Sequence, residues 1–525
     1  MGRNRSLGAV GAAGRPDPLI PPPIQPPVQP LDAPLFPVPW AALAVWALVL
    51  TGLQFSTAHL IGVDSAFHIR FAQVVREGGL TGFPPAFPWM PLTILSPDRY
   101  ADHHMLYHVF LVPFTLGDLR IGAKVAAIVG ALIFVSAFAW VLQRERVPHA
   151  WLGLLALGAS SGDFLFRLGM TRVQALSLAC LFLGFHFALA HRVRALAILS
   201  LVYTWLYDGF PLLIVPVGAV VVAELVTTRR LRLGIVIAAL GGMLAGLILN
   251  PYFPEYLQFM VHHFGDKLLP GEAIRIGREW LPYTPITLIG NGLVAILYLA
   301  FGTAVLVQSG RRADRRLIAS VLVGGAFLIL TLRSKRFIEY FAPAATFAAV
   351  LAGVHVIPRL SRTRRTVLAL LLAGVVVANV SGVAWAIGRK VGALDRYADA
   401  ARLVEASTPA GAMLCTTDWD DFPLLYYYNV HNTYLVGLDP TYLRDRFRDV
   451  YWQWVDLTRG RGSEPSRLLG ERLPCAYVLS DRHHAAFLEQ AAADPGLIEV
   501  LADEEMVLFR VRREGPIPVH PTTVP

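Results

Sequence analysis

Hydrophobic residues recur along this chain in runs close to the length that crosses a bilayer. We assign about eleven such runs, at about 39–58, 120–142, 149–162, 171–190, 195–207, 209–227, 233–250, 284–308, 316–332, 337–356 and 366–387. A helix of roughly 20 apolar residues spans the hydrocarbon core, and the shorter runs fit tilted helices or helices lined by polar cavities. The pattern predicts a mainly α-helical, polytopic membrane protein.

The composition agrees with this prediction. Of 525 residues, 55% are hydrophobic and 16% are charged, with a mean hydropathy of +0.52, which is too apolar for an ordinary soluble domain. The net charge of +9 comes from arginines in short clusters between the apolar runs. Nucleic-acid binding instead favours one basic patch with interleaved aromatic residues. We therefore expect no nucleic-acid partner and interpret the arginines as topology signals.

The two ends of the chain differ from its middle. Residues 1–38 include "RPDPLIPPPIQPPVQPLDAPLFPVP", which is too rich in proline to fold, so we expect a disordered cytoplasmic tail. A cleaved signal peptide is the alternative, but the first apolar run lies far from Met1 and lacks a clear cleavage site. We expect a transmembrane domain over 39–388, an extracytoplasmic α/β domain over 389–515 and a disordered tail over 516–525.

Basic loops alternate with the apolar runs in one consistent order. All of them face the cytoplasm if the N-terminus does, as the positive-inside rule requires; these loops are 143–149, 191–194, 227–232, 308–316 and 358–366. This parity predicts a multi-pass protein of the plasma (inner) membrane with its C-terminal domain outside. It requires that the apolar segment 104–117 does not cross, so we expect a short helix on or in the outer leaflet.

The stretch "GVDSAFHIRFAQ" places an acid, a histidine and an arginine on the outward side, directly after the first run. Its periodicity predicts an amphipathic helix from Asp64 to about Glu77. Asp64 and His68 lie on or beside the apolar stripe, and Arg70 lies on the opposite side. An ionisable group facing lipid costs about 2.5–3.5 kcal/mol, so we expect Asp64 to face a cavity. The alternative is that Asp64 only caps the helix.

Two further outward segments carry acids with histidines or arginines. "DRYADHHMLYH" contains Asp102, His103 and His104, whose side chains are of the kinds that bind Zn or Mn, although a polar loop capped by Asp102 accounts for them as well. "SSGDFLFRLGMTRVQ" brings a second group to helix ends, where either a site or a salt-bridged turn between Asp163 and Arg167 explains it. The candidate site residues of this second group are Asp163 and Arg172. We interpret Asp208 in "YDGFP" as turn chemistry.

The segment "RSKRFIEYFAP" breaks the charge bias that every other loop obeys. It places Arg333, Lys335 and Arg336 at an outward helix end, with Glu339 one turn deeper. Guanidinium groups bind phosphate through paired hydrogen bonds, so this segment favours an anion site over stray interfacial charge. The loop 251–283 has the length of a flap over a site, and it carries Glu272 and Glu279.

After about residue 390, helix-like and strand-like segments alternate. "DRYADAARLVEAS" and "AAFLEQAAA" indicate helices, whereas "AMLCTT", "CAYVLS", "LIEVLA" and "MVLFRVR" indicate strands, a pattern typical of a small α/β domain. Asp418, Asp420 and Asp421 follow the first of these strands, either as helix caps and loop acids or as residues that recognise an acceptor. A disulfide between Cys415 and Cys475 is open, because no spacing rule supports it.

The first outward loop, with the Asp in "DSAFHIRFAQVVREGGL", together with "HHMLYHVFLVPF" and the external tail resembles the GT-C-type membrane glycosyltransferases. The opening motif is similar to that of oligosaccharyltransferase catalytic subunits. "HMLYHVFLVPFTLG" and "KRFIEYFAP" are more similar to aminoarabinose transferases and protein mannosyltransferases. The resemblance covers roughly 39–387 and implies a GT-C-like membrane domain that transfers a sugar from a polyprenyl-phosphate donor to a glycan, lipid or protein acceptor on the outer face.

The resemblance also implies roles for individual residues. Asp64 matches the acid of the first loop, which is a base in some members and a metal ligand in others. Asp163 matches the second acid of the metal-dependent branch, but the paired Asp-x-Asp is absent, so a divalent metal such as Mg or Mn stays an open expectation, with Asp64 and Asp163 as its candidate ligands. Arg336, with Lys335 and Arg333, matches the basic residues near the lipid phosphate. His68, Arg70, Asp102, His103, Arg172 and Glu339 complete the predicted substrate-binding set.

Two other functions fit the same outward charges. A transporter or flippase for lipid-linked saccharides would use them without catalysis, but such proteins usually show internal repeats and polar groups near the bilayer midplane, which this sequence lacks. An inactive scaffold of envelope assembly is the third hypothesis, and the presence of Asp64 argues against it.

Overall fold

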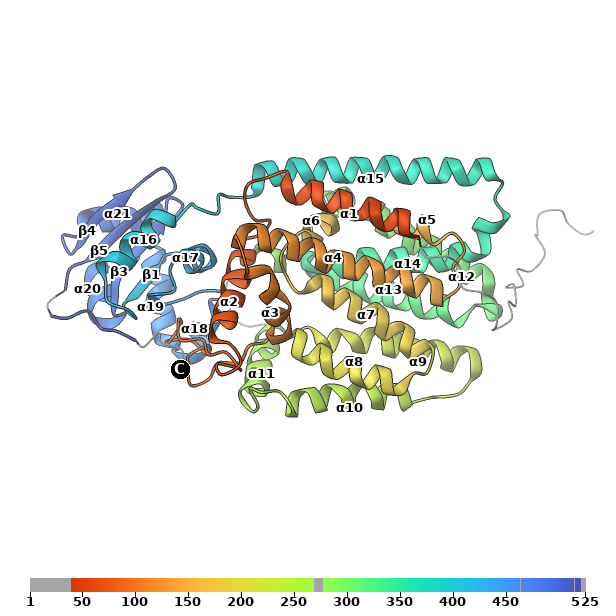
Figure 1. The fold of residues 1–525 in the computed structure, drawn as a ribbon, viewed down its shortest axis with the longest axis horizontal. Coiled ribbons are helices and arrows are strands. Elements are labelled where there is room, and N and C mark those ends of the chain that lie inside the picture. Colours follow the sequence, from red (N-terminus) through yellow and green to blue (C-terminus); the bar gives the residue numbers. More distant parts are fainter. Residues whose placement is uncertain (1–38, 269–276, 463, 514, 521–525) are drawn as a thin grey trace, which may run out of the picture.

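The computed structural model describes residues 39–268, 277–462, 464–513 and 515–520. A helical bundle forms most of the molecule, and a smaller α/β part lies at one end of it (Figure 1). The bundle helices are α1 (Trp40–Phe55), α4 (Leu119–Arg144), α5 (Ala150–Ala159), α7 (Gln174–Leu189), α8 (Val193–Leu206), α9 (Ile214–Thr228), α10 (Gly234–Ile248), α12 (Pro285–Ser309), α13 (Arg315–Arg333), α14 (Ile338–Val356) and α15 (Arg362–Lys390).

Each apolar run of the sequence coincides with one of these helices. Within the described residues, six helices are long and apolar enough to cross a membrane: Leu119–Arg144, Phe210–Thr228, Pro285–Arg312, Arg315–Arg333, Lys335–Arg359 and Arg362–Lys390. The others, among them α1 and α8, are shorter apolar helices. The helical architecture is therefore confirmed, and the count of eleven crossings stays a prediction.

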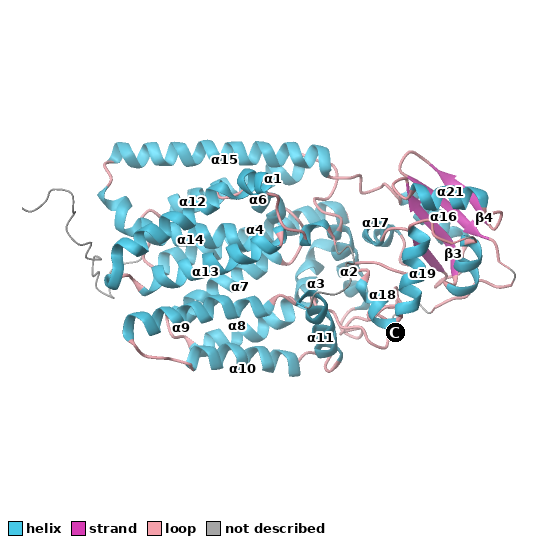
Figure 2. Ribbon diagram, turned by 180° about the vertical axis from the view of Figure 1, so that it is seen from behind, coloured by secondary structure: helices cyan, strands magenta, loops and turns pink. Residues whose placement is uncertain are grey.

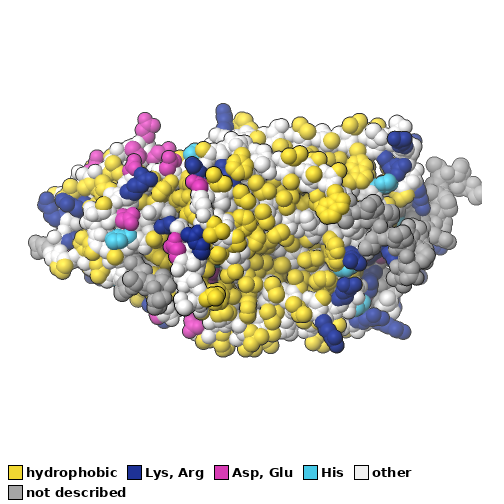
Figure 3. All heavy atoms as spheres, in the orientation of Figure 1, with side chains coloured by type: hydrophobic (Ala, Val, Ile, Leu, Met, Phe, Trp, Pro, Cys, Tyr) yellow, Lys and Arg dark blue, Asp and Glu magenta, His cyan; other side chains and the backbone are white. Residues whose placement is uncertain are grey.

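The face of the bundle seen in Figure 3 is largely apolar. Leu48, Ile329 and Leu370 are 67–73% exposed, which soluble proteins avoid over so large an area and which lipid tolerates. Lys and Arg side chains gather at the end of the bundle away from the α/β part (Figure 3).

Polar side chains cap the first turns of some helices. Asp118 accepts a hydrogen bond from the amide of Ile121 at 2.9 Å, and Thr284 accepts one from the amide of Thr287 at 3.3 Å.

Short helices lie where the bundle meets the α/β part (Figure 1). They are α2 (Asp64–Gly78), α3 (Met105–Leu111) with the turn η1 (Val112–Thr115), and α11 (Glu255–Leu268), whereas the short helix α6 (Gly162–Leu168) packs on α14 and α15 within the bundle. The helix predicted from Asp64 is confirmed, and its stripe of Phe67, Phe71 and Val75 is buried. The apolar segment 104–117 forms α3 and η1, and its place relative to a membrane stays a prediction.

The α/β part contains a five-stranded sheet with helices packed on it (Figure 2). The strands are β1 (Met413–Thr416), β2 (Thr433–Tyr434), β3 (Cys475–Asp481), β4 (Leu497–Ala502) and β5 (Met506–Val511), in the order β2-β1-β3-β5-β4. The first three are parallel, and β5 pairs antiparallel with β3 and β4. The helices are α16 (Ala398–Ser407), α17 (Phe422–Tyr428), α18 (Thr441–Arg446), α19 (Arg448–Thr458), α20 (Pro465–Arg467) and α21 (Ala485–Ala493).

The predicted strands and helices of the C-terminal region are all present. Cys415 on β1 and Cys475 at the start of β3 form a disulfide with a Cα–Cα separation of 5.8 Å, whereas Cys180 is free and buried. Val519, in the predicted tail, forms an isolated bridge with Ala412. The exact domain boundaries stay predictions, and residues 1–38 and 521–525 lie outside the described part of the chain.

Candidate functional site

Three arginines converge on the carboxylate of Glu279 where the bundle meets the α/β part. Arg336 donates to Oε1 at 2.9 Å, and Arg167 and Arg172 lie 3.2 and 3.5 Å from Oε2. The three arginine side chains are only 11–16% exposed. We call Arg167, Arg172 and Arg336 the arginine cluster. Three buried guanidiniums around one carboxylate form a seat for an anion.

The turn after α6 places Arg172 in this cluster. The amide of Thr171 donates to Oγ of Ser65 at 3.0 Å, and the Thr171 hydroxyl donates to the carbonyl of Ala123 at 2.9 Å. The turn also packs against Gly62, whose φ of +82° suits glycine and where a Cβ would come within 3.2 Å of Met170. Fixed in this way to the start of α2, the turn brings Arg172 beside Asp64, with Nε at 3.5 Å from Oδ2.

Two short helical turns bring Glu279 to Arg336. They are η3 (Arg278–Trp280) and η5 (Lys335–Phe337). The hydroxyl of Ser334 donates to the carbonyl of Glu279 at 3.1 Å, and the amide of Lys335 donates to the carbonyl of Leu281 at 3.0 Å. Trp280 then covers the guanidinium of Arg336, 4.8 Å from the ring centre. The hydrogen bonds between these two segments therefore set the geometry of the anion seat.

The charges in the cluster are nearly balanced. Arg167 also donates to Glu339 at 2.8 Å, and the Glu339 side chain is only 4% exposed. Burial alone raises the pKa of Glu279, but the guanidiniums of Arg336, Arg172 and Arg167 outweigh it and hold that pKa below its ordinary value. Glu279 is therefore an anion at neutral pH, in the position where an anionic ligand would meet the arginines.

Asp64 lines the same site and does not cap its helix. The start of α2 has no side-chain cap, and the Asp64 side chain is 35% exposed. Asp420 approaches from the α/β part, in the turn η7 (Trp419–Asp421), where the Trp419 ring lies against Gly277. Asp420 is accessible to solvent, but the protein around it removes part of its hydration. This burial, followed by the charges of Asp64, Asp418 and Glu279, raises the pKa of Asp420 to about 7.

The predicted residues Asp102 and His68 meet through a residue that the sequence did not single out. His108 lies between them, with Nδ1 2.7 Å from Oδ2 of Asp102 and Nε2 2.9 Å from Nδ1 of His68. Asp102 also accepts from the amide of His104 at 2.9 Å, so the loop cap that we weighed is present together with the hydrogen bond to His108.

The remaining histidines and acids form separate pairs. Asp208 is buried and lies 3.0 Å from Nε2 of His263, so it does more than shape a turn. His103 stacks on Phe259, with ring centres 4.6 Å apart.

Asp163 accepts a hydrogen bond from the hydroxyl of Tyr283 at 2.6 Å. The salt-bridged turn between Asp163 and Arg167 is not formed, because Arg167 pairs with Glu279 and Glu339.

Three predicted site residues lie away from the arginine cluster. Arg70 donates to Gln73 at 2.5 Å on the outer side of α2. Arg333 is exposed, and neither it nor Lys335 forms an ion pair among the described residues. Of the outward segment 333–336, only Arg336 reaches the cluster, with a guanidinium nitrogen 2.9 Å from Oε1 of Glu279. Glu272 lies outside the described residues.

The proposed metal ligands do not fit a metal ion. Asp64 is paired with Arg172 and Asp163 with Tyr283, so each carboxylate already has a partner. Within the described ranges, no group of three or more His, Cys, Asp or Glu side chains is placed to hold a metal.

Sequence reasoning missed His108, Tyr283 and the cluster role of Arg167. His108 does lie four residues after His104 in "HHMLYH", so the helical spacing was the available signal. Glu279 lies in the long loop 251–283, and no local pattern distinguishes it from Glu272, because its partners come from two other segments, 160–174 and 333–336.

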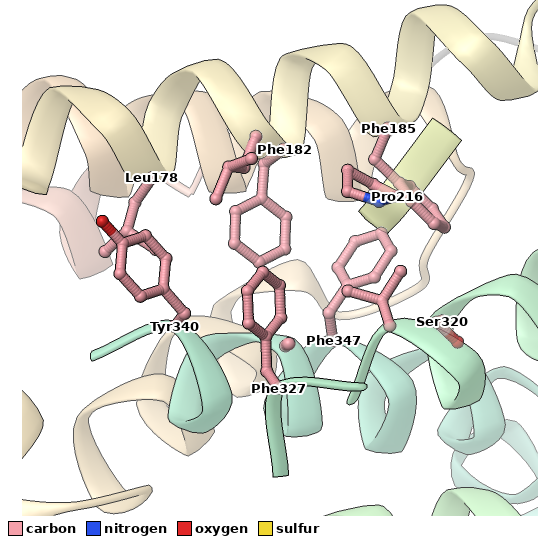
Figure 4. A pocket seen from close by; sticks show the side chains of 11 residues that line it. Leu178, Phe182, Phe185, Pro216, Ser320, Phe327, Tyr340 and Phe347 are labelled. Carbon is pink, nitrogen blue, oxygen red and sulfur yellow. The ribbon is translucent and has the colours of Figure 1, made fainter. Parts of the chain in front are cut away.

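A small apolar cavity lies inside the bundle (Figure 4). Phe182 of α7, Phe327 of α13 and Phe347 of α14 face one another in it. Tyr340, next to Glu339, lies at one end, 3.4 Å from the hydroxyl of Ser177. The cavity is also lined by Leu178, Leu181, Phe185, Pro216, Ser320, Val323 and Ala344.

The fold matches solved membrane enzymes, although no protein-family model and no curated protein matches the sequence. The apo oligosaccharyltransferase of Archaeoglobus fulgidus superposes with a TM-score of 0.60 at 15% identity, over 87% of this chain and 71% of that one. The archaeal oligosaccharyltransferase AglB from Archaeoglobus fulgidus, in complex with an inhibitory peptide and a dolichol-phosphate, gives 0.57 at 15% identity, over 87% of this chain and 71% of that one. ArnT from Cupriavidus metallidurans bound to undecaprenyl phosphate gives 0.57 at 16% identity, over 90% and 97%. The chain therefore has the fold of the GT-C glycosyltransferases.

Proposed function

We propose that this protein is a membrane glycosyltransferase that transfers a sugar from a polyprenyl-phosphate-linked donor to an acceptor on the extracytoplasmic face. The observation that carries the proposal is the arginine cluster, which forms an anion seat beside Asp64 at the end of an apolar bundle. The fold agrees with this proposal, because the superposed ArnT structure holds undecaprenyl phosphate and the superposed AglB structure holds a dolichol-phosphate.

The chemistry follows from the charges. Transfer breaks the bond between the anomeric carbon and a phosphate oxygen, and the electron pair stays on the phosphate. Buried guanidiniums fixed before the reaction stabilise that developing charge without reorganising. The acceptor hydroxyl or amine needs orientation by a nearby carboxylate, and Asp64 lies at the edge of the seat.

The orientation rests on two observations. The basic loops gather at the end of the bundle away from the α/β part (Figure 3), which the positive-inside rule assigns to the cytoplasm. The disulfide between Cys415 and Cys475 belongs to the α/β part, and such bonds persist in oxidising compartments. We therefore propose that the site faces the outside of a plasma membrane.

The experiment that tests the function uses the purified full chain in detergent with a panel of undecaprenyl-phosphate monosaccharides. We expect glycosyl transfer, or slow release of the sugar to water, with at least one donor, and strong loss of both with Arg336→Gln. Arg333→Gln is the matched control, because Arg333 lies three residues earlier but outside the cluster. Movement of donor across vesicles without any sugar transfer would instead identify a flippase.

A further inference from the structure

A chain of three buried side chains leads from the base of α3 to the site. Asp102, His108 and His68 are 2, 2 and 7% exposed, and the chain is held by the bonds of 2.7 and 2.9 Å described above. Anion binding by the arginine cluster does not involve these three side chains. Burying an acid and two imidazoles costs free energy unless each is paired. A functional role would explain why the protein keeps them buried.

The hydrogen bonds determine where the protons lie. As a carboxylate, Asp102 can only accept, so His108 donates through Nδ1–H. A neutral imidazole has one N–H, which leaves a lone pair on Nε2 of His108. His68 must then donate through its own Nδ1–H. The tautomer of His68 is therefore set, with a lone pair on Nε2.

That nitrogen is available to a ligand. Nε2 of His68 has no hydrogen-bond partner in the described part of the chain, and it is not among the fully buried unpartnered atoms. His68 follows Asp64 by four residues on α2, so the two side chains lie on the same face, about 6 Å apart at their Cβ atoms. The lone pair thus borders the space beside Asp64.

Groups from three segments surround His68. The ring contacts His104 and Tyr107, with centres 5.3 and 5.4 Å away. Burial lowers the pKa of His68, and the charges of His108, Arg172 and His103 lower it further. Asp64, one turn earlier on α2, is an acidic residue of the helix that carries His68. His68 is therefore neutral at rest, as a proton acceptor must be.

Resting on the proposed function, we infer that His68 is the catalytic base, whose Nε2 takes the proton of the acceptor hydroxyl or amine. The acceptor O–H or N–H bond breaks, and its electron pair forms the bond to the anomeric carbon. The bond from that carbon to the phosphate breaks, and the phosphate keeps the pair. The proton forms Nε2–H, and the positive charge of the imidazolium is balanced through His108 by Asp102. Asp64 orients the acceptor and pairs with Arg172.

The test compares His68→Gln, Asp102→Asn and the control His186→Gln in the full chain. His186 forms a buried pair with Glu145 at 2.7 Å, on helices of the bundle outside the site. With the donor that the panel identifies, we expect His68→Gln to lower kcat by about 10²–10⁴-fold, the range for a lost general base. Binding of undecaprenyl phosphate should stay within about 2-fold, because the arginine cluster is intact. His186→Gln should keep its activity.

The dependence of the transfer rate on pH distinguishes a catalytic base at His68 from a structural role of that residue. The base works only when neutral, so the rate falls as the pH drops through the pKa of His68. Asp102→Asn removes the charge that stabilises the imidazolium, which shifts this acidic limb to lower pH and lowers the maximal rate. A His68→Gln protein that binds undecaprenyl phosphate and transfers sugar at more than half the wild-type rate would overturn the inference, as would an unmoved limb in Asp102→Asn.

Nitrogen-15 NMR of histidine-labelled wild-type protein provides a second measurement if a variant does not fold. We expect a protonated Nδ1 and an unprotonated Nε2 for His68, and the opposite tautomer would overturn the assignment. A wild-type protein inactive with every donor would contradict the proposed function itself. An active wild type with an active His68→Gln would contradict only the base.

Discussion

Oδ2 of Asp64 lies 3.5 Å from Nε of Arg172 and joins the first residue of α2 to the turn after α6. The same guanidinium lies 3.5 Å from Glu279, so Arg172 connects the acid at the acceptor side with the anion seat. Loss of Asp64 should therefore affect sugar transfer, whereas loss of Arg172 should affect binding of the phosphate.

Asp64→Asn should lower sugar transfer by about 10²-fold or more while binding of undecaprenyl phosphate is kept, because the amide removes the acid but not the arginines. Arg172→Gln should weaken that binding by about tenfold, the effect of roughly 1.4 kcal/mol. Transfer rates and binding by native mass spectrometry would be measured for both variants and the double variant. Strictly additive effects would show that the pair is not coupled.

Glu279→Gln should tighten the binding of undecaprenyl phosphate by several-fold. The carboxylate now neutralises Arg167, Arg172 and Arg336, and an anionic ligand must compete with it. Glu224→Gln is the matched control, because Glu224 is also a buried acid but pairs with Arg315 and His191. Equal or weaker binding by Glu279→Gln would show that the carboxylate does not occupy the anion seat.

Asp420 should make donor binding depend on pH near neutrality. Its pKa of about 7 means that it is neutral below and an anion above that pH, so an anionic phosphodiester should bind less tightly as the pH rises through 7. The charge of a phosphodiester donor is constant over this range, so the change in affinity comes from the protein. Asp420→Asn should flatten the affinity between pH 6 and pH 8, as measured by titration of the donor. A slope that persists in this variant would assign the dependence to another group.

Thiol labelling should establish the orientation. Arg311 and Glu405 are exposed at opposite ends of the molecule, and the natural cysteines are either buried or in the disulfide. In intact cells, a membrane-impermeant maleimide should label Glu405→Cys, and Arg311→Cys only after permeabilisation. The reverse pattern would invert the proposed topology.

Local patterns predicted the elements well. The apolar runs gave the bundle helices, and the 3.6-residue period from Asp64 gave α2, because burial of one face repeats at fixed spacing along the chain. In the α/β part, short β-rich segments gave β1, β3, β4 and β5. The two-residue strand β2 was not predicted, since it has too few residues to show a pattern.

The sequence by itself determined the helical bundle, the α/β part and the outward loops that carry acids, histidines and arginines, because hydrophobic spacing and charge bias are local properties. Only the tertiary structure decided which of these groups meet. Arg336 reaches Glu279, whereas Arg333, three residues earlier, does not, and His108 joins Asp102 to His68. Such contacts depend on backbone hydrogen bonds and packing between segments about 40 to 170 residues apart, which no local pattern encodes.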